Sequence, residues 1–195
     1  MSGLRTFVGL PLTDPFADLL AAACARVRDL EPAWKGEKWV PRQNLHVTLR
    51  FIGDVGHDEL DVLADAIASE VGECEGPFSL PFEGLRPVQS LRHVRMLWAT
   101  FLDPEGSCAA LASAVERAAL AFGVEPDERQ FVPHVTLVRA RKPHALSERA
   151  FEAGQAVVSE APASMSVTRA TLFSSTLTPT GPIYTELRSY PFDSD

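Results

Sequence analysis

Hydrophobic and polar positions follow two periods along the chain, and these periods predict strands and amphipathic helices in alternation. Residues 31–43 contain Pro32, Gly36 and Pro41 and are predicted to be irregular, and a turn is predicted over residues 179–182. The alternating segments predict strands over residues 5–11, 45–52, 78–88, 93–102, 132–138, 164–177 and 183–189. The segments with apolar residues at helical spacing predict helices over residues 15–30, 58–71, 104–122 and 146–158.

The tetrapeptide His-Val-Thr-Leu occurs twice on predicted strands, over residues 46–49 and 134–137. Both copies are surrounded by the same order of elements, namely a helix, the motif strand, a second helix and a strand pair. This order predicts an α+β fold built from a duplicated unit, with two antiparallel sheets facing a central cleft and helices on the outside. Because no low-complexity linker separates the halves, we expect residues 1–195 to form a single bilobal domain.

Each copy of the motif places an imidazole and a hydroxyl on the same face of its strand. Successive side chains of a strand point to opposite faces, so His46 shares a face with Thr48, and His134 shares one with Thr136. If a twofold axis relates the halves, both pairs converge on one cleft. The alternative is two strands whose polar faces are only solvated, and the repetition favours convergence.

The composition is that of a soluble globular protein, with 46% hydrophobic and 23% charged residues. The chain has no run of 18 apolar residues that could cross a membrane, and its first residues lead directly into a strand-like segment without a charged leader. We therefore expect a cytoplasmic protein with no membrane partner. The net charge of −8 argues against a broad basic surface that coats nucleic acid, but it permits a nucleic acid gripped locally at one end.

The remaining metal-ligating residue types lack the spacing of a metal site. Cys24, Cys74 and Cys108 are odd in number and widely spaced, which indicates small buried residues in a reducing compartment. The motif histidines lack His-x-x-x-His spacing and a neighbouring acidic cluster. We therefore expect neither a metal ion nor another cofactor.

Two facing imidazoles are suited to general acid–base catalysis on a phosphate. One neutral ring takes a proton from the attacking water or hydroxyl, and the other, protonated, gives one to the leaving oxygen; each role typically contributes about 10²–10⁴ in rate. Histidine is suited to both roles because its ordinary pKa of about 6.5 lets both forms exist near neutrality. The threonine hydroxyls can donate to phosphate oxygens. Because the two copies are identical, the motif does not say which histidine gives the proton.

Beyond the motifs, the chain resembles the 2H phosphoesterases, specifically the bacterial and archaeal RNA 2′,3′-cyclic phosphodiesterases formerly called 2′-5′ RNA ligases. The similarity covers most of the chain. It rests on the opening strand at residues 5–10, the first motif at 39–40 and 44–55, the central strand at 95–99, the second motif at 133–139, and the C-terminal hairpin at 174–184.

The resemblance implies hydrolysis of RNA 2′,3′-cyclic phosphate ends or cyclic nucleotides to 2′-phosphomonoesters without a metal, with 2′-5′ ligation as the possible reverse reaction. It implies that His46 is the proton donor to the leaving 3′ oxygen and that His134 is the proton acceptor from water, with Thr48 and Thr136 on the phosphate. We expect a monomer. A 2H enzyme for another cyclic or 2′-5′ nucleotide, and a nucleotide-binding module that has lost turnover, remain alternatives.

Four further residues are candidates for substrate binding. Arg139 matches a family position that helps to hold phosphate, although strict alternation points it away from His134, so it needs a strand end or a bulge to reach the cleft. Arg50 shares the face of His46 by the same alternation. Phe131 and Tyr184 are candidates for stacking on a base.

Other polar and aromatic residues receive weaker predictions. Core packing is predicted for Trp98. His57, His93 and His144 lack a threonine two residues on and are predicted at the surface. A local basic rim for an RNA end is predicted from cationic residues near the motif edges, which are Arg42, Arg86, Arg92, Arg95, Arg141 and Lys142.

Overall fold

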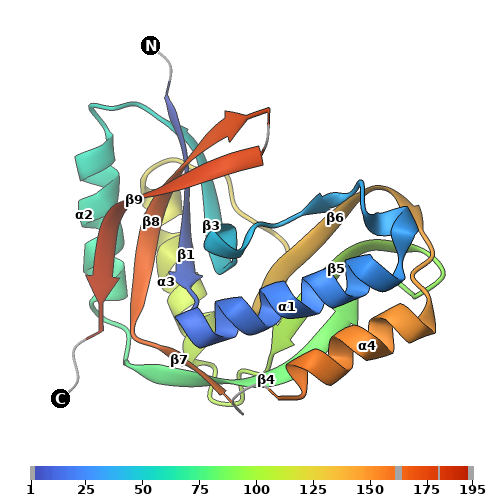
Figure 1. Cartoon of the computed structure of the whole chain (residues 1–195). Coiled ribbons are helices and arrows are strands. Elements are labelled where there is room, and N and C mark those ends of the chain that lie inside the picture. The colour runs from blue at the N-terminus through green and yellow to red at the C-terminus, as the bar shows by residue number, and fades with distance from the viewer. Residues whose placement is uncertain (1–2, 161–163, 180, 193–195) are drawn as a thin grey trace.

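The computed structural model describes residues 3–160, 164–179 and 181–192. One strongly curled antiparallel sheet and four α-helices make up the fold (Figure 1). The strands are β1 (Leu4–Pro11), β2 (Lys38–Trp39), β3 (His46–Val55), β4 (Phe78–Pro87), β5 (Val94–Phe101), β6 (His134–His144), β7 (Ser164–Val167), β8 (Arg169–Thr178) and β9 (Gly181–Pro191). The helices are α1 (Asp14–Leu30), α2 (Leu60–Val71), α3 (Ser107–Ala121) and α4 (Glu148–Val158).

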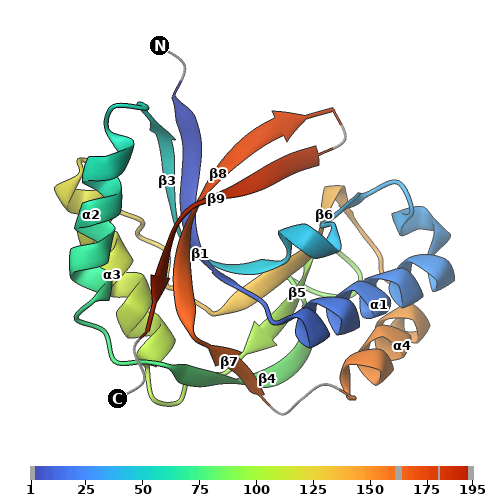
Figure 2. The same ribbon diagram turned by 60° about the vertical axis from the view of Figure 1, so that its left-hand side comes forward.

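The strands follow one continuous path, in the order β7-β4-β5-β6-β3-β1-β8-β9, with β2 paired to β6. The α+β class and the antiparallel pairing agree with the prediction, but the prediction of two separate sheets is wrong. The two motif strands join the halves, because β3 pairs with β6 at Val47 and Val135. The register extends over that one pair, and Figure 2 shows β3 and β6 diverging from it towards their other partners, β1 and β5.

Each half of the sheet contains strands from the other half of the chain. With the short strands β2 and β7 left aside, the order β-α-β-α-β occurs twice, as β1-α1-β3-α2-β4 and as β5-α3-β6-α4-β8. In space, however, β8 pairs with β1 and β4 pairs with β5. The single strand predicted over residues 164–177 is in fact two strands separated at Thr168, because β7 pairs with β4 while β8 pairs with β1. The common order supports a duplicated unit, which stays a prediction.

The helices pack in two pairs, α1 with α4 and α2 with α3 (Figures 1 and 2). The α1–α4 pair lies against the half formed by β4, β5 and β6, where the Phe16 ring contacts those of Phe82 and Phe101 at centroid distances of 5.4 and 5.9 Å. At Gly154 of α4, an added Cβ would lie 2.6 Å from Cγ2 of Val27, so α1 and α4 can pack this closely only around a glycine. No helix in the described ranges is long and apolar enough to cross a membrane.

The sequence located the helices to within three residues at each end, and their capping residues explain where they begin. Pro15 lies in the first turn of α1, where its missing N–H costs no hydrogen bond. The Ser147 hydroxyl accepts a hydrogen bond from the Ala150 N–H and caps α4. All three cysteines carry free thiols; Cys24 and Cys108 are buried as expected, while Cys74 is partly exposed.

Candidate active site

The two His-x-Thr pairs lie side by side where β3 meets β6. Antiparallel pairing of Val47 with Val135 brings His46 towards Thr136 and Thr48 towards His134. Both histidines are therefore placed by the short junction between the halves of the sheet.

Each of the two imidazoles is held by a hydrogen bond to the backbone carbonyl two residues before it. Nδ1 of His46 lies 2.7 Å from the Asn44 carbonyl oxygen, and Nδ1 of His134 lies 2.7 Å from that of Val132. A carbonyl oxygen only accepts, so each Nδ1 carries a hydrogen and each neutral ring presents an unprotonated Nε2. Nε2 of His46 lies 2.9 Å from Oγ1 of Thr48, which donates to it. Nε2 is therefore the atom through which each ring can exchange a proton.

Burial and nearby positive charge keep both rings neutral in the ligand-free protein. Burial is the main cause that lowers the pKa of His46 to about 4; the Asn44 carbonyl opposes it, and positive charge on His134 and Arg139 adds to it. Burial also lowers the pKa of His134, with a smaller contribution from the Arg139 charge. An anion bound between the rings would oppose these effects and favour protonation.

The identical motifs have different neighbours across the sheet. Thr48 pairs with Gly9 of β1, whereas Thr136 pairs with Trp98 of β5. The Trp98 ring stacks on His134 with a centroid distance of 3.8 Å and an interplanar angle of 27°. The prediction that Trp98 packs in the core is wrong, because its pairing with Thr136 places it on the histidine face; its Nε1 is buried without a hydrogen-bond partner.

Gly9 pairs with Thr48 as Trp98 pairs with Thr136, but the residue at this position beside His46 must be small. An added Cβ at Gly9 would lie 2.9 Å from the Val47 carbonyl oxygen and 3.1 Å from Cδ2 of His46. His46 is surrounded by aromatic rings instead, with Phe7 at 4.7 Å and Tyr184 at 5.3 Å between centroids. Tyr184 thus lies beside the catalytic candidate, and Phe7 is a neighbour that sequence reasoning missed.

A bulge in β6 determines where Arg139 points. Thr136 pairs with Trp98 and Val138 pairs with Leu97, so Leu137 is an extra residue in its strand. The bulge shifts the alternation by one residue, which leaves Leu137 and Val138 both buried and places Arg139 on the face of His134. Arg139 is exposed there, with Nη1 3.2 Å from Sδ of Met96.

An equivalent bulge in β3 turns Arg50 away from the site. Thr48 pairs with Gly9 and Arg50 with Val8, so Leu49 is the extra residue. The expectation that Arg50 shares the face of His46 is therefore wrong. Its guanidinium pairs with Glu116 of α3 on the helix side of the sheet, and its side chain is 10% exposed. Phe51 takes the histidine face in its place, 46% exposed, with its ring 5.8 Å from that of Phe7.

The remaining candidates lie in varied settings. Phe131 is partly buried against the core and has no ring contact with either histidine among the described contacts. Arg42 is bound by Asp14 and Asp18, so it does not belong to the basic rim. The surface prediction holds for His57 and His93, whereas His144 is only partly exposed, at 28% of its side chain, and stacks on the buried Trp34 at 4.3 Å.

Asn44 connects the site to the C-terminal hairpin, a role that sequence reasoning missed. The residue is 6% exposed, and its Nδ2 donates to the Pro182 carbonyl oxygen at 2.7 Å. Its own carbonyl oxygen accepts from His46, so one residue holds both the imidazole and the hairpin that carries Tyr184. The only sign of this role in the sequence is the position of the asparagine, two residues before the motif histidine.

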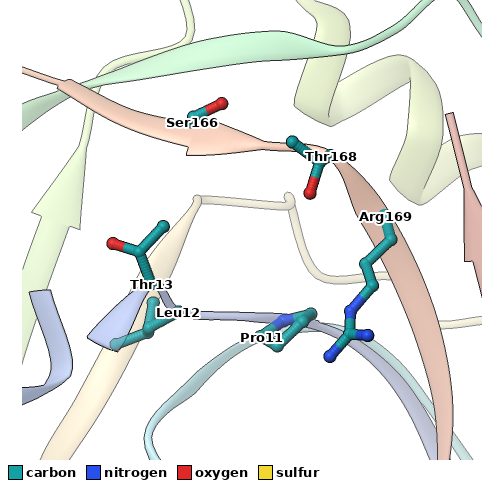
Figure 3. Close-up of a pocket in the computed structure, with 6 residues that line it drawn as sticks. All are labelled: Pro11, Leu12, Thr13, Ser166, Thr168 and Arg169. Atoms are coloured by element: carbon teal, nitrogen blue, oxygen red, sulfur yellow. The ribbon is translucent and has the colours of Figure 1, made fainter. Parts of the chain in front are cut away.

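A separate small pocket contains neither motif histidine (Figure 3). Arg169 on its wall is already paired with Glu186 at 3.0 Å, so the pocket has less to offer an anion than the histidine site. Within the described residues, no group of three or more His, Cys, Asp or Glu side chains could hold a metal ion. The pocket is lined by Pro11, Leu12, Thr13, Ser166, Thr168 and Arg169.

Comparisons with known proteins found relatives in sequence and in fold. The RNA 2′,3′-cyclic phosphodiesterases of Methanothermobacter thermautotrophicus and Aquifex aeolicus are each 30% identical to the chain, over 96% and 97% of it and 98% of each relative. Two solved structures share the fold. A Thermus thermophilus protein superposes with a TM-score of 0.74 at 24% identity, covering 96% of this chain and 97% of that one. LigT of Escherichia coli complexed with 3′-AMP has a TM-score of 0.71 at 22% identity, covering 98% of this chain and 99% of LigT.

A sequence model of one family matches most of the chain, over residues 18–178. This stretch includes both His-x-Thr pairs, the Trp98 strand and Arg139. The chain therefore belongs to the 2′-5′ RNA ligase superfamily.

Proposed function

We propose that this protein hydrolyses RNA 2′,3′-cyclic phosphate ends to 2′-phosphomonoesters by acid–base catalysis at its two histidines. One observation carries the proposal: β3 and β6 bring two imidazoles together, each with Nδ1 bound to a carbonyl and Nε2 left for proton exchange. The names of the relatives, RNA 2′,3′-cyclic phosphodiesterases, support the choice of substrate.

The proposed step is an in-line displacement at phosphorus. Water attacks opposite the 3′ oxygen, and Nε2 of His134 takes its proton as the new P–O bond forms. The P–O3′ bond breaks, and Nε2 of His46 gives its proton to the leaving oxygen. The non-bridging oxygens are held by the hydroxyls of Thr48 and Thr136 and by the guanidinium of Arg139. Tyr184 contacts the terminal nucleoside.

The surroundings of the two rings support this division of roles. The imidazolium that forms on His134 lies against the face of Trp98, and an aromatic face attracts a cation. A His46 that is protonated in the complex is a strong acid in an apolar setting, so it gives up its proton readily. Binding of the phosphate anion supplies the attraction that protonates His46 beforehand.

Ligation uses the same groups with a different nucleophile. If the 5′-hydroxyl of a second RNA end attacks in place of water, His134 takes its proton as the new P–O bond forms, the P–O3′ bond breaks and His46 protonates the leaving 3′ oxygen, which gives a 2′-5′ linkage. We therefore propose ligation as a slower side activity. The histidine site needs no residue of a second copy, and we propose that the enzyme is a monomer.

Phosphorus NMR on the reaction of RNA ending in a 2′,3′-cyclic phosphate, in buffer with EDTA, tests the function. The expected product carries a 2′-phosphomonoester, formed at the same rate with and without EDTA. A 3′-phosphate product would contradict the assigned leaving group, and loss of turnover in EDTA would contradict the metal-free step. Binding of the RNA with no product at all would instead indicate a nucleotide-binding module.

A further inference from the structure

The positive charge of this acidic protein is concentrated beside the active site. Three chain segments, residues 35–39, 86–95 and 139–144, hold eight cations and one acid, Glu37, in a chain whose net charge is −8. All eight cations have exposed side chains. This basic surface consists of Lys35, Lys38, Arg86, Arg92, Arg95, Arg139, Arg141 and Lys142.

Strand pairing brings these three segments together. Arg139 of β6 pairs with Lys38 of β2 on one side and with Met96 of β5 on the other. Arg86 of β4 pairs with Trp98 of β5, which in turn pairs with Thr136 of β6. The loop that carries Arg92 is tied to the end of β6, because the Leu146 N–H donates to the Leu91 carbonyl oxygen at 2.8 Å, and Val94 pairs with His144.

The eight cations differ from most of the remaining arginines in whether they form ion pairs with acidic side chains. Arg42, Arg50, Arg117, Arg129, Arg169 and Arg188 all form ion pairs, but within the described ranges none of the eight does. Glu37 is the one acid within these three segments, and it already accepts from the Arg141 backbone N–H at 2.7 Å and lies 3.4 Å from Nε2 of His144. A concentrated and unneutralised positive surface attracts a polyanion.

We infer that this surface binds the phosphates of the RNA strand upstream of the cyclic end. The inference rests on the proposed function, because a 2′,3′-cyclic phosphate closes the 3′ end and leaves every other phosphate on the 5′ side. Arg139 belongs to both the site and the basic surface, so the strand leaves the site directly onto the surface. The physiological substrate is therefore an oligonucleotide rather than a cyclic mononucleotide.

The test compares a cyclic-ended RNA hexamer with a cyclic mononucleotide at several salt concentrations. We expect the hexamer to have at least about tenfold higher kcat/KM at 50 mM salt, and this advantage to fall with log salt at a slope of about −0.7 for each phosphate held. The triple variant R92A/R95A/K142A should lose most of the advantage and flatten the slope. The control Arg26→Ala removes an exposed arginine of α1 and should keep the wild-type ratio.

A second readout is independent of turnover. Fluorescence anisotropy with a hexamer that already ends in a 2′-phosphate should show at least about tenfold weaker binding to the triple variant than to the Arg26→Ala control. Equal binding by both variants, or a hexamer no better than the mononucleotide, would overturn the inference. Failure of the proposed function looks different, because the wild type would then bind the hexamer through this surface without hydrolysing either substrate.

Discussion

His46 and His134 share their neighbours along the chain but not their neighbours across the sheet. Gly9 leaves room for His46 among Phe7 and Tyr184, whereas Trp98 lies flat against His134. A cation over an indole face is stabilised by about 0.5–2 kcal/mol, which favours forming the imidazolium at His134. The difference is carried by the partner strands, so it could not be predicted from the identical tetrapeptides.

A substrate with sulfur in place of the bridging 3′ oxygen separates the two roles. A thiol with a pKa of about 8.5 leaves without a proton, whereas an alkoxide needs one. His46→Ala should therefore lose about 10²–10⁴ in rate on the oxygen substrate but less than about tenfold on the sulfur substrate. His134→Ala should lose about equally on both. The opposite pattern in steady-state rates would exchange acid and base.

The buried, neutral state of His46 makes a prediction about stability. Its pKa is about 4 in the folded protein, below the 6.5 of an unfolded chain, so the unfolded state takes up a proton first as the pH falls. The contribution of His46 is unchanged above pH 6.5 and falls by about 3 kcal/mol between pH 6.5 and 4.

Urea unfolding of the wild type and His46→Gln at pH 7 and pH 4 measures this loss. Taking the difference between the two proteins cancels the titration of the other groups. We expect the wild type to lose about 3 kcal/mol more than the variant over this range. Equal losses would show that the pKa of His46 is not lowered in the folded protein.

At the scale of elements, periodicity predicted where strands and helices lie but not how the strands are offset. Alternation placed His46 and Thr48 correctly on one face, yet it put Arg50 with them and Arg139 away from His134. The bulges at Leu49 and Leu137 reverse both placements. A bulge is set by the register against β1 and β5, and neither motif strand encodes that register in its own residues.

The break at Thr168 was missed for a similar reason. Residues 164–177 continue one alternating pattern, but their two parts pair with strands in different halves of the sheet. Local periodicity carries no information about which partner a strand chooses. The contact between His144 and Trp34 was missed because it joins residues far apart in the chain.

We predict that the hydrogen bond from Asn44 helps to hold the β8–β9 hairpin at the site. Asn44→Ala removes the donor to the Pro182 carbonyl and should lower the free energy of unfolding by about 1–3 kcal/mol. Asn44→Asp keeps the size but lacks the donor, so it should be no more stable than the alanine variant. Chemical denaturation measures both. A change below about 0.5 kcal/mol in either variant would show that the bond does not hold the hairpin.

At the scale of the whole molecule, β4 pairs with β5 of the other half of the chain, and β8 pairs with β1. Each half of the sheet therefore depends on the other half of the chain. The candidate active site lies where the halves meet, so the geometry of the two histidines depends on both halves being folded. We therefore propose that residues 1–195 form one cooperative unit, in agreement with the expectation of a single domain.

Equilibrium unfolding tests this cooperativity with two probes. Trp34, Trp39 and Trp98 all lie in or beside the half formed by β2, β4, β5 and β6, so their fluorescence reports on that half, while far-ultraviolet circular dichroism reports on all elements. We expect the two curves to coincide in a single transition. A fluorescence transition that precedes the loss of circular dichroism would contradict one cooperative unit.

The proposed reaction depends on two converging histidines that together open a cyclic phosphate on RNA. Its most direct test is kcat/KM on cyclic-ended RNA in EDTA for the wild type, His46→Ala and His134→Ala, with His57→Ala as the matched control at the surface. We expect each motif variant to lose at least about 10²-fold and the control to keep wild-type activity. Near-wild-type activity in either motif variant would contradict the claim.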